Sequence, residues 1–188
     1  MLGDVRSYFD NPVAAKKLRD EALSWIGTPF RELSGLDDSS ELNHLKGQGG
    51  GIDCIGLPQA IFYAIGATKR KWLFPRELSD YGISDLGGKF LDWLRGKVDD
   101  DQSQALKAMF VELNVPKAVT EIHAECPRDF FKPGDLLVLR HASLFHMPVL
   151  YDDDLHFVNS LPRIGVIEGT IQDSSYSSHL VAVFRLKP

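Results

Sequence analysis

The sequence has few cysteines and no long apolar segment. Of its 188 residues only two are cysteines, Cys54 and Cys126, and they lie far apart without forming a C-x-x-C pair. We therefore expect neither a disulfide framework nor a zinc site made of cysteines. No apolar run approaches the roughly 18 residues that span a membrane, and the N-terminus lacks the apolar stretch of a signal peptide. We expect synthesis in the cytoplasm, with both thiols reduced.

The sequence also lacks an excess of positive charge. Lysine and arginine together number 21, aspartate and glutamate 26, which gives a net charge of −5. Basic residues cluster only at Lys69-Arg70-Lys71, which is typical of a solvated turn. This balance argues against nucleic acid or an anionic membrane as a partner. The hydrophobic content of 44% and the length instead fit one well-buried globular domain covering residues 1–188.

One short stretch carries a pattern with chemical meaning. The glycine run Gly49-Gly50-Gly51 leads through Ile52 to Asp53 and Cys54, and an apolar helical pattern follows. Asp53 is placed to cap this helix, because its carboxylate can accept from the amides of the first turn. Cys54 then takes the first helical position, where N–H groups and the helix dipole favour a thiolate. A passive core cysteine at a buried helix start is the alternative.

Helical patterns dominate the first two thirds of the chain. Asn11-Pro12 predicts a helix start, with an apolar stripe that continues to Ile26. Residues 31–51 are polar and rich in glycine, which indicates a long loop. The helix after Cys54 should run to about Ala64 and stop near Gly66, and Pro58 within it cannot donate to the carbonyl of Cys54. Two further short helices are expected, over Lys89–Leu94 and Gln104–Leu113, in a helical insertion at about residues 83–125.

The pattern changes after Pro133-Gly134-Asp135 to short apolar runs separated by turn residues. These runs predict an antiparallel meander, with strands at Leu136–Arg140, Phe145–Tyr151, Leu155–Ser160, Arg163–Ile167 and Leu180–Leu186. Helices followed by strands indicate the α+β class.

Two of these strands carry the polar groups that a nucleophilic thiol requires. With a two-residue turn at Asp152-Asp153, His146 falls directly opposite Asn159, with Cβ atoms about 5 Å apart. A three-residue loop would pair His146 with Ser160 instead, and Pro148 favours a bulge that shifts the register. In the first register, His146 can take the thiol proton and Asn159 can orient the ring, as in cysteine hydrolases.

The other histidines do not suggest a metal site. Alternation places His146 and His156 on opposite faces of the sheet, and no helical pair of ligands completes a motif. We expect no metal and no other cofactor. The remaining histidines are expected at the surface: His44, His123, His141 and His179.

Four segments resemble the NlpC/P60 family of cysteine peptidases. The segment Trp25-Ile26-Gly27-Thr28-Pro29-Phe30 is similar to W-x-G-T-P-Y, Gly51-Ile52-Asp53-Cys54-Ile55-Gly56-Leu57 to G-x-D-C-S-G-L, and Lys132-Pro133-Gly134-Asp135-Leu136-Leu137 to x-P-G-D-L. The strand Phe145–Tyr151 is similar to H-V-G-I-Y, and Phe157–Ser160 to the F-I-H-A strand that follows it. Together the segments lie within residues 22–168 in the family's order.

The resemblance implies a papain-like fold, with a cysteine-bearing helix packed on an antiparallel sheet. It implies Cys54 as nucleophile, His146 as base and Asn159 in the third polar place. It also implies hydrolysis of amide bonds in cell-wall peptides, so that peptidoglycan stem peptides are the expected partner. Within this family, the motifs of the chain are most similar to those of the phage-tail and tail-like branch. This similarity implies phage-tail proteins as further partners. Association with a tail would then bring the protein to the wall without a leader peptide.

Departures from the family pattern concern the substrate more than the three polar groups. Ile55 replaces a serine that helps bind substrate, and Phe30 replaces a tyrosine near the site; with Asp53 these are the expected substrate-binding positions. Two alternatives therefore stay open. One is an amidase or acyltransferase that acts on a substrate other than peptidoglycan. The other is a non-catalytic tail-associated or wall-binding module.

Overall fold

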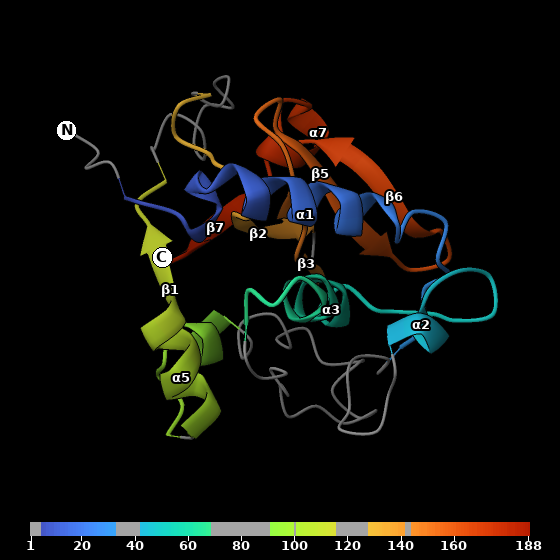
Figure 1. The fold of residues 1–188 in the computed structure, drawn as a ribbon, viewed down its shortest axis with the longest axis horizontal. Coiled ribbons are helices and arrows are strands. Elements are labelled where there is room, and N and C mark those ends of the chain that lie inside the picture. The colour runs from blue at the N-terminus through green and yellow to red at the C-terminus, as the bar shows by residue number, and fades with distance from the viewer. Residues whose placement is uncertain (1–4, 33–41, 69–90, 100, 116–127, 142–143) are drawn as a thin grey trace.

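Mixed helices and an antiparallel sheet make up the computed structural model of the chain (Figure 1). It describes residues 5–32, 42–68, 91–99, 101–115, 128–141 and 144–188. The helical elements are η1 (Tyr8–Asp10), α1 (Pro12–Leu23), α2 (Leu42–Leu45), α3 (Gly56–Ala64), α5 (Asp101–Met109) and α7 (Ser174–Ser177). The strands are β1 (Phe110–Leu113), β2 (Leu136–His141), β3 (Leu144–His146), β4 (Val149–Leu150), β5 (His156–Leu161), β6 (Gly165–Thr170) and β7 (Leu180–Leu186). The α+β class is confirmed.

Helix α1 begins where the sequence predicts. The side chain of Asn11 accepts from the backbone N–H of Val13 at 2.9 Å, and Pro12 occupies the first helical position. Leu18 and Ala22 bury the inner face of the helix. The apolar stripe ends earlier than expected, because α1 stops at Leu23 and Ile26 is 43% exposed.

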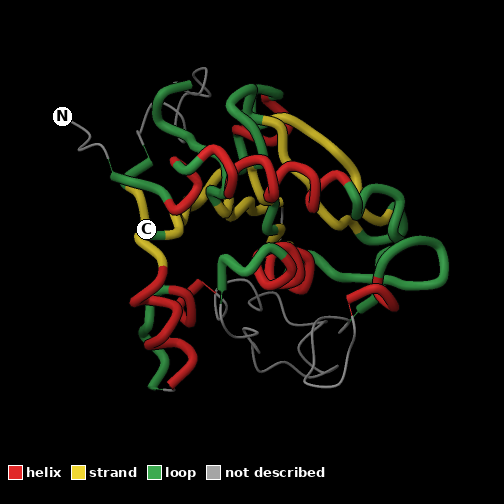
Figure 2. Tube along the Cα trace, in the orientation of Figure 1, coloured by secondary structure: helices red, strands yellow, loops and turns green. Residues whose placement is uncertain are grey.

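The sheet has the strand order β1-β7-β2-β4-β5-β6, with β3 also paired to β2 (Figure 2). The expected meander holds from β2 to β6, whereas β7 returns to the other side of β2. The prediction of a helix over Gln104–Leu113 is wrong in its second half. Residues Phe110–Leu113 form β1, because they pair with Leu186–Val183 of β7, a contact far away in the sequence.

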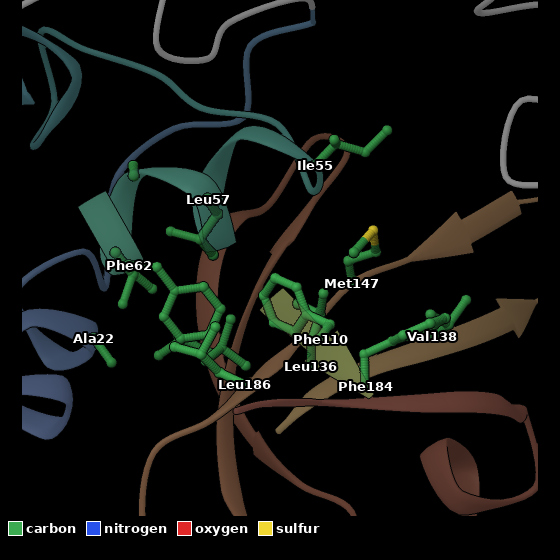
Figure 3. Packing of buried hydrophobic residues seen from close by; sticks show 14 of the residues in the cluster. Ala22, Ile55, Leu57, Phe62, Phe110, Leu136, Val138, Met147, Phe184 and Leu186 are labelled. Atoms are coloured by element: carbon green, nitrogen blue, oxygen red, sulfur yellow. The ribbon is translucent and has the colours of Figure 1, made fainter. Parts of the chain in front are cut away.

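Each face of the sheet has its own hydrophobic cluster. Helices α1 and α3 contact each other and share the first cluster with the sheet. Figure 3 shows Leu57 and Phe62 of α3 in this cluster beside Leu136 and Phe184 of the sheet. Neighbouring strand residues alternate into a second cluster, formed by Leu113, Phe130, Phe131, Leu137, Leu139, Leu150, Leu155, Phe157, Ile171, Leu180 and Val183. The first cluster therefore packs α3, and with it the segment around Cys54, on one face.

The hairpin between β4 and β5 has a different register from the predicted one. Val149 pairs with Val158, and Tyr151 donates to the carbonyl of His156 at 2.9 Å, so the turn contains four residues, Asp152 to Leu155. The side chain of Asp152 accepts from the backbone of His156 at 3.0 Å, and Leu155 adopts a positive φ of 64°. These contacts stabilise the longer turn. The prediction that His146 lies directly opposite Asn159 is therefore wrong.

One buried ion pair joins the sheet to the chain around it. Arg185 of β7 is 3% exposed and binds both carboxylate oxygens of Asp135 at 2.8 Å. It also donates to the carbonyl oxygens of Phe130 and Val5, at 2.7 and 3.0 Å. The Pro-Gly-Asp segment before β2 is thus held by a buried charge pair that is also hydrogen-bonded to the backbone.

Several predictions fall on residues outside the described ranges. These concern Cys126, His123, the Lys69-Arg70-Lys71 turn and much of the 31–51 loop and the 83–125 insertion. Within the described part of that insertion, residues 91–94 are helical, as the sequence predicts.

Candidate active site

Cys54 lies at the beginning of α3, in a turn capped by Asp53. The Asp53 carboxylate accepts from the backbone N–H groups of Ile55 and Gly56, at 3.1 and 2.7 Å. The carbonyl of Asp53 accepts from Leu57 N–H at 3.0 Å, which is already an α-helical bond. The Asp53 carboxylate binds the predicted amides, but the regular helix begins at Gly56 with Ile55 as its N-cap, so Cys54 does not occupy the predicted first helical position. Cys54 lies in the turn that leads into α3, close to the backbone dipoles that favour a thiolate.

The thiol of Cys54 meets the strand that carries His146. Its Sγ lies 3.7 Å from the carbonyl oxygen of Phe145 in β3, the residue directly before His146. Cys54 is half-buried, and both Cys54 and Phe145 pack against the first cluster. Two segments 91 residues apart in the sequence are thus in contact at the candidate nucleophile.

His146 is half-buried and its Nδ1 atom has unused hydrogen-bonding capacity. It pairs across the sheet with Leu139 of β2, and Nδ1 is buried without a hydrogen-bond partner. Burial lowers the pKa of His146 below its ordinary value, and the neighbouring His141 lowers it further. The neutral imidazole is therefore the main form near pH 7, and a neutral imidazole can accept a thiol proton. His141 in turn packs edge-on against His179, with ring centres 4.5 Å apart.

Asn159 is buried in β5 with both amide atoms unpaired. It is 1% exposed, and among the residues that the structure describes neither its Oδ1 nor its Nδ2 has a hydrogen-bond partner. The observed register, extended by one pair, places Asn159 across from Pro148. The displacement from the predicted register is two residues, so Asn159 is not the direct cross-strand partner of His146. Because Ser160 faces Ile52, alternation directs Asn159 to the opposite side of β5.

The three expected substrate-binding residues differ in exposure. Asp53 is fully buried and caps α3, and Ile55 is 6% exposed within the first cluster. Phe30 is half-buried and therefore the most accessible of the three. Phe30 is the residue of this set that a substrate can reach most readily.

A metal-binding cluster and a membrane-spanning helix are both absent from the ranges that the structure describes. No group of three or more His, Cys, Asp or Glu side chains there is arranged to hold a metal ion. His156 instead lies 2.9 Å from the Asp152 carboxylate and stacks on Tyr151. None of the described helices combines the length and the apolar character needed to cross a membrane.

Comparison with known proteins gives no relative: the chain matches no family model, and no curated protein matches it.

Proposed function

We propose that this protein is a cysteine amidohydrolase in which Cys54 is the nucleophile, His146 the base and Asn159 the third polar group. The observation that carries the proposal is the contact of the Cys54 thiol with the carbonyl of Phe145, which directly precedes His146 in β3. Buried polar side chains are nearly always hydrogen-bonded, yet Nδ1 of His146 and both amide atoms of Asn159 are buried without partners. Groups left unpaired among the described residues on β3 and β5, together with a thiol that touches β3, favour a reactive site over a passive core.

The proposed reaction is an acyl transfer through a thioester. The Cys54 thiol gives its proton to His146, and sulfur attacks the amide carbonyl carbon to form a tetrahedral oxyanion. The backbone N–H of Cys54 at the start of the helix donates to this oxyanion. The C–N bond then breaks, the amine leaves with the proton from His146, and water hydrolyses the thioester. Catalytic hydrogen bonds are often long without substrate and tighten when it binds, so the unpaired Nδ1 of His146 among the described residues is compatible with its role as base.

The proposed substrate class is the stem peptide of peptidoglycan. Its support is the resemblance of the segments around Cys54 and His146 to the NlpC/P60 pattern. In this proposal the protein reaches the cell wall as part of a phage tail or tail-like particle. Its partners there are tail proteins.

One observation favours a second candidate, an amidase or acyltransferase that acts on another amide substrate. Ile55 stands where the family pattern has a substrate-binding serine, and it is 6% exposed in the core. A buried isoleucine offers no hydrogen bond to a peptide substrate. The nucleophile and base would be unchanged, and only the substrate would differ.

Digestion of purified stem peptides and intact peptidoglycan tests the proposal, with products identified by mass spectrometry. We expect new amine and carboxylate ends with the natural chain, and none with Cys54→Ala. Transfer to added amines, or cleavage only of simple amides, would favour the second candidate. No turnover of any amide, together with an ordinary Cys54 thiol, would contradict catalysis and favour a binding module.

A further inference from the structure

The residue two positions before Cys54 is held at both of its backbone polar groups. The N–H of Ile52 donates to the carbonyl oxygen of Pro29 at 3.0 Å. The carbonyl oxygen of Ile52 accepts from the hydroxyl of Ser160 at 2.6 Å, across 108 residues of sequence. Ile52 and Ser160 are both completely buried. The path of the chain into Cys54 is therefore set by two long-range hydrogen bonds.

These bonds belong to a closed ring that includes the edge of the sheet. Ser160 pairs with Val166 of β6, whose N–H donates to the carbonyl oxygen of Thr28 at 2.8 Å. Thr28 precedes Pro29, so the ring runs from Ser160 through Val166, Thr28 and Pro29 to Ile52 and back. Gly165 allows this approach, because a Cβ at that position would lie 2.4 Å from the Thr28 carbonyl oxygen. Gly165 also has a φ of +94°, which favours glycine.

We infer that Ser160 is a positioning residue of the candidate active site: its hydroxyl fixes Ile52 and thereby sets how Cys54 approaches β3. This inference rests on the proposed function. Only Asp53 separates Ile52 from Cys54, and Asp53 is itself engaged in capping α3. The thiol contact with the Phe145 carbonyl, at 3.7 Å, depends on this placement. A misplacement of about 1 Å can lower an enzymatic rate by roughly 100-fold.

The chain offers a matched control for this hydrogen bond. Ser103 in α5 is also completely buried, and its hydroxyl donates to the carbonyl oxygen of Trp93 at 2.6 Å. The two bonds have the same chemistry, length and burial, so losing either removes one hydrogen bond from a carbonyl oxygen. The Trp93 carbonyl keeps a second bond, from the N–H of Gly96 at 3.0 Å. Only the bond from Ser160 leads to Cys54. A purely structural role predicts similar behaviour from both substitutions.

The test is the rate of Cys54 alkylation by iodoacetamide as a function of pH, read separately from Cys126 by mass spectrometry of the labelled peptides. The full chain is compared with Ser160→Ala and Ser103→Ala, and thermal unfolding shows that each variant is folded. We expect Ser160→Ala to raise the pH midpoint and to slow alkylation at neutral pH by about tenfold. Ser103→Ala should leave the profile unchanged while lowering thermal stability by a similar amount.

An unchanged profile in folded Ser160→Ala would overturn the inference, even if the natural chain has a reactive thiol. An ordinary midpoint near 8.5 in the natural chain itself would instead contradict the proposed function. If Ser160→Ala does not fold, Gly165→Ala disturbs the same ring from the opposite side. We expect it to shift the profile in the same direction, and an unchanged profile there would overturn the inference.

Discussion

Two buried polar arrangements in this molecule differ in how completely their hydrogen bonds are made. Asp135 and Arg185 form a bidentate ion pair, and Arg185 also donates to two backbone carbonyls. Nδ1 of His146 and the side-chain amide of Asn159 are also buried, but they have no hydrogen-bond partner within the described part of the chain. In the first arrangement, the hydrogen bonds offset the cost of burying the two charges. In the second, burying the unpaired atoms lowers the stability of the fold, and no hydrogen bond in the described chain offsets that cost.

The difference distinguishes a structural polar group from a functional one. An unsatisfied buried polar group costs about 1–3 kcal/mol, so a folded chain seldom keeps one without a reason. At Asp135 each charge is satisfied and no group remains for a ligand. At His146 and Asn159, the unpaired side-chain atoms can still bind a proton or a substrate. Breaking the ion pair should therefore affect stability, and altering the other pair should affect reactivity.

The largest effect on stability is expected from Arg185→Met. It leaves the Asp135 carboxylate buried without its partner, which costs about 3–5 kcal/mol. Urea unfolding measures this loss. The control is Lys16→Met, which breaks an exposed ion pair with Asp20 and should cost less than about 1 kcal/mol. Equal losses from both substitutions would contradict a stabilising role for the buried pair.

A smaller effect, with the opposite sign, is expected from Asn159→Leu. Removing an unpaired buried amide should leave the free energy of unfolding unchanged or raise it by about 1 kcal/mol. Turnover should fall by about tenfold or more, if the amide orients the base. Asn11→Leu is the control, since that asparagine caps α1 and its loss should cost about 1 kcal/mol. Lower stability with unchanged turnover in Asn159→Leu would assign Asn159 to the fold alone.

The smallest effect is a pH dependence of stability that comes from His146. The folded state holds its pKa below the ordinary value of 6.5, so below about pH 6.5 the unfolded chain takes up this proton more readily. Its contribution to stability is present above that pH and is lost as pH falls. Comparing urea unfolding of the natural chain and His146→Gln on both sides of that pH measures it. An identical pH dependence in the two proteins would contradict a depressed pKa.

Local features of the fold could be predicted from the sequence, and long-range ones could not. The caps at Asn11 and Asp53 depend on neighbours within a few residues, and both are present. Strand β1 depends on pairing with β7, so the local pattern around Phe110 predicted a helix instead of a strand. The hairpin register depends on Asp152 stabilising a four-residue turn with Leu155 in a left-handed conformation.

The same limit applies to the candidate site. Cys54 and His146 could be selected because their residue types and local patterns carry chemistry. Their proximity is supported by the contact between Cys54 and Phe145, which no local pattern contains. Ser160 entered the prediction only as an alternative strand partner of His146. Its bond to Ile52 links residues 108 positions apart, so no local sequence pattern could predict it.

The most direct test of the central claim is the pH profile of Cys54 alkylation in the natural chain and in His146→Ala. We expect the natural thiol to react with a midpoint clearly below 8.5, the value of an unperturbed cysteine, and His146→Ala to react more slowly near neutral pH. Cys126, followed in the same digest, serves as an internal reference. A midpoint near 8.5 that does not depend on His146 would contradict the nucleophile and base assigned here.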